Sequence, residues 1–295
     1  MKVKNFIYAG LDFIFDKNGN FWFLEANGAT RGFVEYQNLY KSYEPVIGIA
    51  KFMKSKGRNN CILISKKERF SEEHASNKWL YKKLKEYMKL HACYIEDNQK
   101  RTKYLIDKNG NLVKPDCILC HDYKVSKKLS KRTITINNCK LRKFVWNKYK
   151  TLNLVKKHTK IKTPRTFVAR NNKQLKEILI KHSFKNGFVI KPIGGTEGKG
   201  VHVVGNHEKI PRINKKMLLQ ERITPKLIHK KYWDVRIFII NGKFCGGIMR
   251  ESIHRVTNIA RGASAYRVPK KILNKLKRPA LKIVSVIDKN FKKEG

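Results

Sequence analysis

The chain has 295 residues, 41% of them hydrophobic and 30% charged, and its formal net charge is +45. This composition excludes a disordered chain, because enough apolar side chains are present to bury a core, and the length allows two or three lobes. The sequence shows no apolar run long enough to span a membrane and no signal-peptide pattern, so we predict a cytoplasmic protein without a membrane partner.

The excess of positive charge has two interpretations. It could mark a surface that binds nucleic acid or another polyanion. It could also reflect a general bias toward Lys, Asn and Ile, because the basic residues are spread over nearly every segment. We favour the compositional bias and leave non-specific polyanion binding open.

Residues 5–27 predict a β-hairpin, because two apolar-rich strands flank the Asn18-Gly19 turn signal. Glu25 and Asn27 are two residues apart and therefore point to the same face of the second strand, and Asp12 of the first strand can face them. Carboxylate and amide oxygens are ligands that Mg²⁺ takes. The hairpin therefore predicts a magnesium site, with exposed strand carboxylates as the alternative.

The next part of the chain alternates between helical and strand patterns. Helices are expected around 38–56 and over 71–91, with strands at 60–65, 103–107 and 116–120. These elements predict an αβ lobe, in which no catalytic motif is present. A further helix is expected over 144–158.

Residues 188–204, FVIKPIGGTEGKGVHVV, predict two strands joined by a glycine-rich loop. Glycines let backbone N–H groups close around an anion, and Lys191 and Lys199 add positive charge beside it. The loop matches neither the Walker P-loop nor GxGxxG, because a strand rather than a helix follows. An ordinary hairpin loop is the alternative.

A strand over 217–223 comes next, and then a second hairpin over 234–252 that turns at Asn241-Gly242. An acidic and two basic residues, Asp234, Arg236 and Arg250, interrupt its apolar strands. A buried ion pair between Asp234 and Arg236 is one explanation. Residues 269–291 predict a basic amphipathic helix.

These motifs together resemble the ATP-grasp ligases over nearly the whole chain. The resemblance implies a mixed α+β and α/β architecture: an ATP-grasp fold, whose two α+β lobes clamp ATP, plus a preATP-grasp-like αβ lobe. The fragments DVR at 234–236 and VTN at 256–258 look most like the RimK and YheC/YheD-type branches of this glutathione synthetase-like family. The family's N…GG segment is matched only in part, because Ala263 replaces the second glycine.

The resemblance also implies domain limits. Residues 1–45 would form the metal-binding hairpin and the helix after it, and 46–145 the preATP-grasp-like domain. Residues 146–223 would form the lid lobe, and 224–295 a second lobe that 1–45 completes.

The resemblance further assigns roles to individual residues. Two magnesium ions would be bound by Asp12, Glu25 and Asn27. ATP would be contacted by Lys148, Lys191, Gly194, Gly195, Thr196, Gly198, Gly200, Gln220, Glu221, Ile223 and Asn258. Arg236 and Arg250 would be catalytic, with Arg250 contacting the transition state. Arg31 and Gly32 lie where family members often touch substrate.

The order of the motifs departs from the family, because the metal-binding hairpin comes first here. Circular permutation and a slice from tandem domains both explain this order. In the slice, 1–45 would close an upstream domain. A head-to-tail oligomer that shares hairpins is a third explanation. We expect a site that the chain completes itself.

The implied reaction is Mg²⁺-dependent ligation of a carboxylate to an amine at the expense of ATP, through an acylphosphate. The amine acceptor would be an amino acid, a peptide or a protein. The alternative is an inactive protein of the same fold that binds nucleic acid or an acidic partner. Retention of Asp12, Glu25, Asn27 and Lys191 favours the enzyme.

Overall fold

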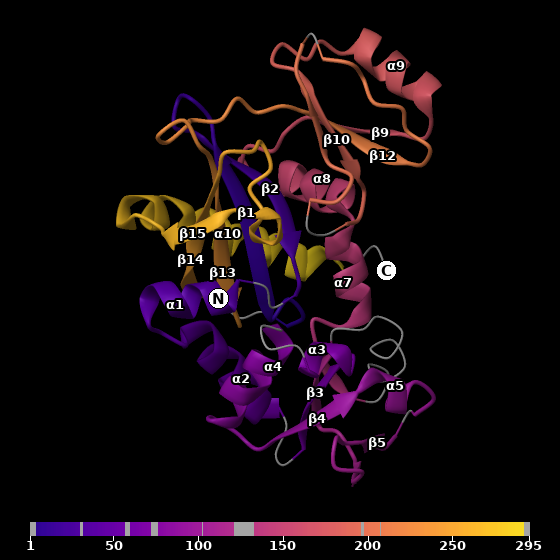
Figure 1. Ribbon diagram of the computed structural model, residues 1–295, viewed down its shortest axis with the longest axis vertical. Coiled ribbons are helices and arrows are strands. Elements are labelled where there is room, and N and C mark those ends of the chain that lie inside the picture. Colours follow the sequence, from indigo (N-terminus) through magenta and orange to yellow (C-terminus); the bar gives the residue numbers. More distant parts are fainter. Residues whose placement is uncertain are drawn as a thin grey trace.

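The computed structural model describes residues 4–29, 32–56, 60–71, 76–101, 103–120, 133–195, 198–206 and 208–291. The chain forms three layers of sheet, stacked along the long axis of the molecule with helices packed around them (Figure 1). In the described part of the chain, no helix has the length and apolar character needed to cross a bilayer.

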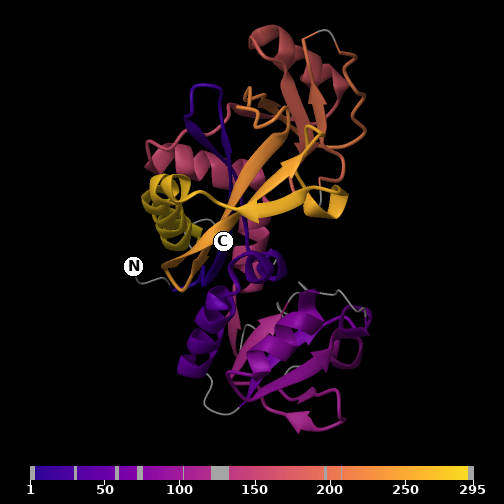
Figure 2. The ribbon, with the colours of Figure 1, turned by 60° about the vertical axis from the view of Figure 1, so that its left-hand side comes forward.

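The central sheet combines the two ends of the described chain. Its strand order is β15-β14-β13-β1-β2, and every neighbouring pair is antiparallel. The strands are β1 (Tyr8–Phe15), β2 (Phe21–Asn27), β13 (Tyr232–Ile240), β14 (Lys243–Ser252) and β15 (Ser264–Arg267). Because β1 pairs with β13 of the same chain, the N-terminal hairpin completes this chain's own sheet (Figure 2).

The upper sheet carries the glycine-rich loop. Its order is β11-β10-β12-β9, and all of its pairs are antiparallel. The strands are β9 (Thr166–Ala169), β10 (Phe188–Pro192), β11 (His202–Val204) and β12 (Met217–Glu221), with helix α9 (Asn172–Lys181) packed on β9. The loop thus joins two adjacent antiparallel strands, as the sequence predicts.

The third sheet is parallel, with the order β4-β3-β7-β8. Its strands are β3 (Cys61–Ser65), β4 (Leu90–Tyr94), β7 (Cys117–Cys120) and β8 (Ile134–Ile136), and a small hairpin is formed by β5 (Leu105–Ile106) and β6 (Leu112–Val113). The helices of this lobe are α2 (Glu44–Lys56), α3 (Glu68–Ser71), α4 (Ser76–Lys85) and α5 (Ile95–Asn98). The helix predicted over 71–91 was too long, because β4 already begins at Leu90.

The strands of the parallel sheet lie within 61–136 and those of the upper sheet within 166–221, whereas the central sheet takes its strands from 8–27 and 232–267. That these ranges form separate domains stays a prediction.

The helix predicted over 144–158 is two helices, α7 (Cys139–Trp146) and α8 (Lys148–His158). Asn147 separates them: its side chain accepts a hydrogen bond from the N–H of Lys150 and so caps the start of α8. This break matters for function, because it puts Lys148 at the first position of α8, beside the glycine-rich loop.

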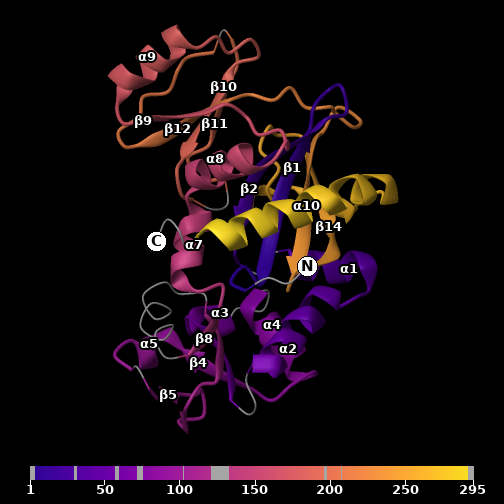
Figure 3. The same cartoon turned by 180° about the vertical axis from the view of Figure 1, so that it is seen from behind.

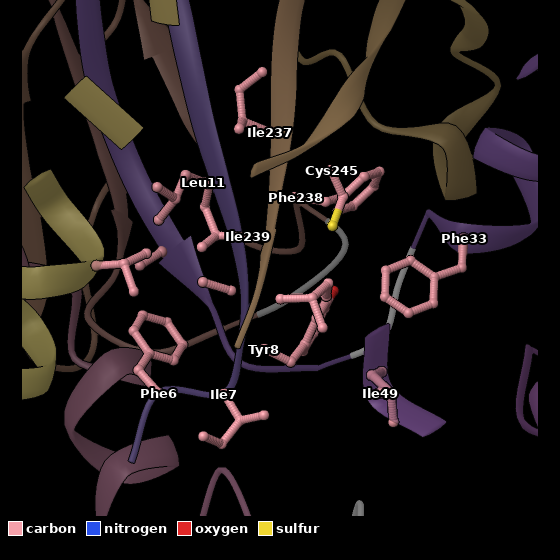
Figure 4. Packing of buried hydrophobic residues seen from close by; sticks show 14 of the residues in the cluster. Phe6, Ile7, Tyr8, Leu11, Phe33, Ile49, Ile237, Phe238, Ile239 and Cys245 are labelled. Carbon is pink, nitrogen blue, oxygen red and sulfur yellow. The ribbon is translucent and has the colours of Figure 1, made fainter. Parts of the chain in front are cut away.

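Helices α8 and α10 (Lys270–Asn290) pack against the central sheet, and α1 (Phe33–Tyr40) packs against β14 and β15 (Figure 3). Leu11 of β1 and Ile237 and Ile239 of β13 are fully buried in the hydrophobic core (Figure 4). Because side chains alternate along a strand, the residues next to these three in the sequence face the opposite side of the sheet. Asp12 and Arg236 lie on that side.

Asp288 near the end of α10 anchors the segment that leads into β1. Its carboxylate accepts hydrogen bonds from the backbone N–H groups of Lys4, Asn5 and Phe6, at 2.9, 2.7 and 2.7 Å. The Asp288 side chain is buried, and Phe6 beside it is fully buried. The contact therefore fixes the hairpin to the helix that covers its sheet.

We predict that Asp288→Ala lowers the free energy of unfolding by about 2–3 kcal/mol, because buried N–H groups lose their acceptor. Urea unfolding of the purified variant measures this change. Asp97→Ala, at an exposed position, should change stability by less than about 0.5 kcal/mol. Equal effects of the two substitutions would contradict the anchoring role.

Candidate functional site

A cleft of about 580 Å³ lies between the central sheet and the upper sheet. Its floor is formed by β1, β2, β13 and β14, and its roof by β10, β12 and the glycine-rich loop. The start of α8, the start of α1 and the loop after β14 close its sides. Most of the residues that the sequence assigns to a site lie along this cleft.

The three proposed metal ligands meet on the floor. Asp12 of β1 lies directly opposite Glu25 of β2, and Asn27 follows two residues later on the same face. The side-chain amide of Asn27 donates a hydrogen bond of 3.1 Å to Oε1 of Glu25. The register of β1 and β2 shifts after Asp12, so the hairpin carries one irregularity at this point.

The floor is crossed by a buried row of alternating charges, in the order Asp234, Arg250, Asp12, Arg236. Arg236 donates two hydrogen bonds to Asp12, each of 2.7 Å. Arg250 donates to both oxygens of Asp234, at 2.6 and 2.7 Å, and to Oδ2 of Asp12 at 3.1 Å. The predicted pair between Asp234 and Arg236 was wrong: these residues lie two apart on one strand, and each finds its partner on the neighbouring strand.

Ion pairs hold the row together, although burial raises the pKa of Asp234 against the opposing effect of Arg250. Burial alone would raise the pKa of Asp12, but Arg236 and Arg250 outweigh it and hold the pKa well below its usual range. Burial opposes the charge on Arg250, and the two aspartates more than compensate, so its pKa rises. Two positive and two negative groups thus cancel on the floor, although the chain as a whole is strongly basic.

Two lysines meet at the side of the cleft that faces the glycine-rich loop. Nζ of Lys148 donates a 2.9 Å hydrogen bond to the carbonyl oxygen of Gly195 and lies 3.3 Å from Oε2 of Glu25. It therefore bridges the loop and the hairpin. Lys191, at the end of β10, is 8% exposed. Burial lowers its pKa to about 8; Glu25 opposes this shift and Lys148 adds to it.

The glycines of the loop play different parts. Gly195 and Gly198 line the cleft, whereas Gly194 and Gly200 do not. A Cβ on Gly194 would come within 3.0–3.1 Å of the Trp146 ring, so this glycine permits close packing against the end of α7. Gly200 has a φ of 70° and turns the backbone back toward β11. Thr196 lies outside the described residues.

Three residues assigned to ATP, Gln220, Glu221 and Ile223, line the cleft at or just after the end of β12, but the two polar side chains already have partners. Both oxygens of Glu221 accept hydrogen bonds from Arg165, at 2.7 and 2.8 Å. The Gln220 amide donates to the Thr166 hydroxyl at 2.8 Å. A ligand at this end would therefore meet backbone groups and the apolar side chain of Ile223.

The loop after β14 supplies residues that the sequence reasoning missed. Thr257 lines the cleft and donates a 2.6 Å hydrogen bond to Oδ2 of Asp234, which ties this loop to the charged floor. Arg261 donates to the carbonyl oxygen of Gly198 at 3.2 Å and so joins the same loop to the glycine-rich loop. Asn258 lines the cleft, as expected. The VTN fragment was the available signal for Thr257.

Residues 145–291 match the family model of the RimK-like ATP-grasp domain. The chain carries a RimK-like ATP-grasp domain. The matched region supplies the roof of the cleft and two strands of its floor, β13 and β14. The N-terminal hairpin, outside the matched region, supplies the other two strands of the floor.

Two solved structures share the fold. A candidate gamma-glutamylcysteine synthetase from Methylobacillus flagellatus KT matches with a TM-score of 0.59 at 12% identity, over 97% of this chain and 88% of that one. D-alanyl-alanine synthetase A from Vibrio cholerae matches with a TM-score of 0.56 at 10% identity, over 78% and 81%. Likenesses at this identity establish the fold.

One sequence relative is a coenzyme gamma-F420-2:alpha-L-glutamate ligase from Methanocaldococcus jannaschii, which is 28% identical over 131 residues. The match covers 43% of this chain and 45% of the relative. The chain therefore spans less than half the length of this relative.

The N-terminal hairpin fits magnesium through Glu25 and Asn27. Among the described residues there is no cluster of three or more His, Cys, Asp or Glu side chains that could hold a metal. An amide oxygen is also a Mg²⁺ ligand, and Asn27 uses only its N–H₂ group in its contact with Glu25. Asp12 accepts three N–H bonds, and a carboxylate offers about four lone-pair sites, so one remains.

We predict that Arg250→Met lowers the free energy of unfolding by about 3–5 kcal/mol, because it leaves Asp234 buried without its cation. Urea unfolding measures the loss. The double variant Arg250→Met/Asp234→Asn should recover part of it, because the uncompensated charge is removed. A single variant as stable as the wild type would show that the buried row does not hold the floor together.

We predict a pH dependence from Lys191. Between pH 8 and about 10.5 the unfolded chain keeps the Lys191 proton and the folded chain does not, so stability rises with pH across this window. Relative to Lys191→Met, the wild type should gain about 3 kcal/mol between pH 7.5 and 10.5. Urea unfolding at both pH values checks this, with the exposed Lys216→Met as the control that shows no such gain.

Proposed function

We propose that this protein is an ATP-dependent carboxylate–amine ligase that acts through an acylphosphate and uses Mg²⁺. The observation that carries the proposal is the composition of the cleft. Two lysines and a glycine-rich loop on one side meet two arginines and a hairpin with magnesium-type oxygens on the other. The RimK-like match supports the same reaction class.

The nucleotide would lie under the upper sheet. The adenine would rest between the apolar side chains of Val189, Val203 and Ile223, at the end of β12. The phosphates would extend toward Lys148 and Lys191, where a triphosphate supplies the negative charge that the two buried ammonium groups lack. Lys148 would then exchange its contact with Glu25 for a phosphate oxygen.

Glu25 and Asn27 would hold one or two Mg²⁺ ions, with Asp12 contributing its remaining lone pair. Bound there, magnesium would neutralise charge on the β- and γ-phosphates. The glycine-rich loop would cover the phosphates and exclude water, which protects a reactive acylphosphate from hydrolysis.

The chemistry has two steps. A substrate carboxylate oxygen attacks the γ-phosphorus, the bond from this phosphorus to the β-bridging oxygen breaks, and ADP leaves. The substrate ammonium first releases a proton to solvent, and the free amine nitrogen then bonds to the acyl carbon. The carbon–oxygen bond to phosphate breaks, and the nitrogen passes its second proton to the departing phosphate. Arg250 and Arg236 supply donors on the cleft floor that can stabilise the negative charge of the tetrahedral intermediate.

The proposed reaction needs a carboxylate and an amine, and the name of one relative suggests an amino acid for one of these substrates. The relative from Methanocaldococcus jannaschii is named as an L-glutamate ligase. We propose an amino acid as one substrate of this chain, with L-glutamate as the first to test. A peptide or a protein could also supply the amine.

We predict that the full chain with ATP and Mg²⁺ converts an amino-acid carboxylate to a hydroxamate when hydroxylamine is present, and releases ADP in equal amount. Hydroxylamine traps acylphosphates, so it reports the first step without knowledge of the natural amine. The twenty amino acids form the donor panel. Arg250→Lys, which keeps the charge but loses the forked pair of donors, should lower the rate by about 10²–10³-fold.

The exposed Arg278→Lys on α10 is the matched control and should keep the wild-type rate. Isothermal titration with a non-hydrolysable ATP analogue and Mg²⁺ accompanies the assay. A wild type that binds no nucleotide, yet binds an oligonucleotide with steep salt dependence, would overturn the ligase proposal in favour of a polyanion-binding protein.

A further inference from the structure

The acidic side chains of the cleft differ in whether they have a partner. Four of the five that line it are paired: Asp12 with Arg236, Glu25 with Lys148, Glu221 with Arg165 and Asp234 with Arg250. The fifth is Glu35, on α1. Within the described ranges, Glu35 makes no ion pair or hydrogen bond through its side chain.

The rotation of α1 is fixed by aromatic packing. Phe33 meets Tyr8 and Phe238 edge to face, with ring centroids 5.1 and 5.3 Å apart (Figure 4). The Tyr36 and Phe238 ring centroids are 5.9 Å apart. Successive residues of a helix turn by 100°, so Glu35 lies about 200° from Phe33, away from this core face. The same aromatic contacts that hold α1 on the sheet therefore leave Glu35 at the cleft.

The place where α1 begins adjoins the arginines. Gly32 precedes the helix with a φ of 94°, and a Cβ added there would lie 3.2 Å from Ile248 of β14. Ile248 pairs with Arg236 on β13 and stands two residues from Arg250 on β14. All of these residues line the cleft. Glu35 therefore lies at the end of the cleft near Arg236 and Arg250, and not near the upper sheet.

A carboxylate without a cation is unusual in this cleft, because its basic side chains exceed its acidic ones. Such a group is suited to a ligand that brings its own positive charge. The two-step reaction needs an amine, which is an ammonium ion at neutral pH when it belongs to an amino acid. We propose that Glu35 binds the ammonium group of the amine substrate and determines the specificity for it. This inference rests on the proposed ligase function.

A structural role for Glu35 makes a different prediction. An acidic residue in the first turn stabilises a helix through its dipole, and Glu44 occupies the first turn of α2 in the same way. Glu44 does not line the cleft. Glu44→Gln is therefore the matched control for Glu35→Gln, since both substitutions remove one first-turn charge from a helix.

The test compares two nucleophiles on the full chain with ATP, Mg²⁺ and the carboxylate donor that the hydroxamate panel identifies. Hydroxylamine is uncharged at neutral pH and needs no carboxylate to bind it. The twenty amino acids, beginning with L-glutamate, are the ammonium-bearing nucleophiles. For Glu35→Gln we expect the KM of the amino-acid amine to rise about 10- to 100-fold. The rate with hydroxylamine and the KM for ATP should stay within about twofold of wild type.

Glu44→Gln should leave all of these constants unchanged, and Glu35→Asp, which keeps the charge, should recover part of the amine KM. If Glu35→Gln leaves the amine KM unchanged while the wild type makes hydroxamate and amide, the role of Glu35 is overturned and the ligase stands. If the wild type makes neither product, the proposed function fails and the inference fails with it.

Discussion

The buried row Asp234, Arg250, Asp12 and Arg236 is the interaction on which the cleft depends. Its members come from three strands. Asp12 accepts hydrogen bonds from Arg236 and Arg250, which lie 224 and 238 residues away in the sequence. Buried charges are costly unless they are paired and hydrogen-bonded, so the hairpin and the C-terminal strands stabilise one another only when both are in register. The row thus couples the placement of the hairpin's carboxylates to the placement of the arginines.

Above this neutral floor, the cleft prepares a place for negative charge. Lys191 is buried enough that its pKa falls to about 8, so part of its charge is absent near neutral pH until an anion arrives. Lys148 forms an ion pair with Glu25, with 3.3 Å between Nζ and Oε2. A triphosphate with magnesium would satisfy both lysines and give Glu25 a metal in exchange. The charges that line the cleft therefore suit a ligand of that chemistry, and the overall charge of the chain is not needed to explain them.

The loop after β14 connects the floor of the cleft to its roof. Thr257 donates a hydrogen bond to Asp234 on the floor, and Arg261 donates one to the carbonyl oxygen of Gly198 in the roof. On the other side, Lys148 joins Gly195 of the roof to Glu25 of the floor. These bridges span the two sheets at opposite sides of the cleft. Movement of the glycine-rich loop would therefore change the contacts of Lys148 and of the loop after β14 with the charged floor.

Local sequence patterns specify the secondary-structure elements and much of the site. Asn-Gly turns at 18–19 and 241–242 specify two hairpins, the spacing of Glu25 and Asn27 puts them on one face, and the glycine-rich run specifies the roof loop, because all of these follow from backbone geometry over a few residues. The contacts that these residues make follow from the folded chain. Asp12 is joined to Arg236 and Arg250, Glu221 is held by Arg165, and Gly194 packs on Trp146. These contacts depend on the register of strands far apart in the chain, and no local pattern carries that register.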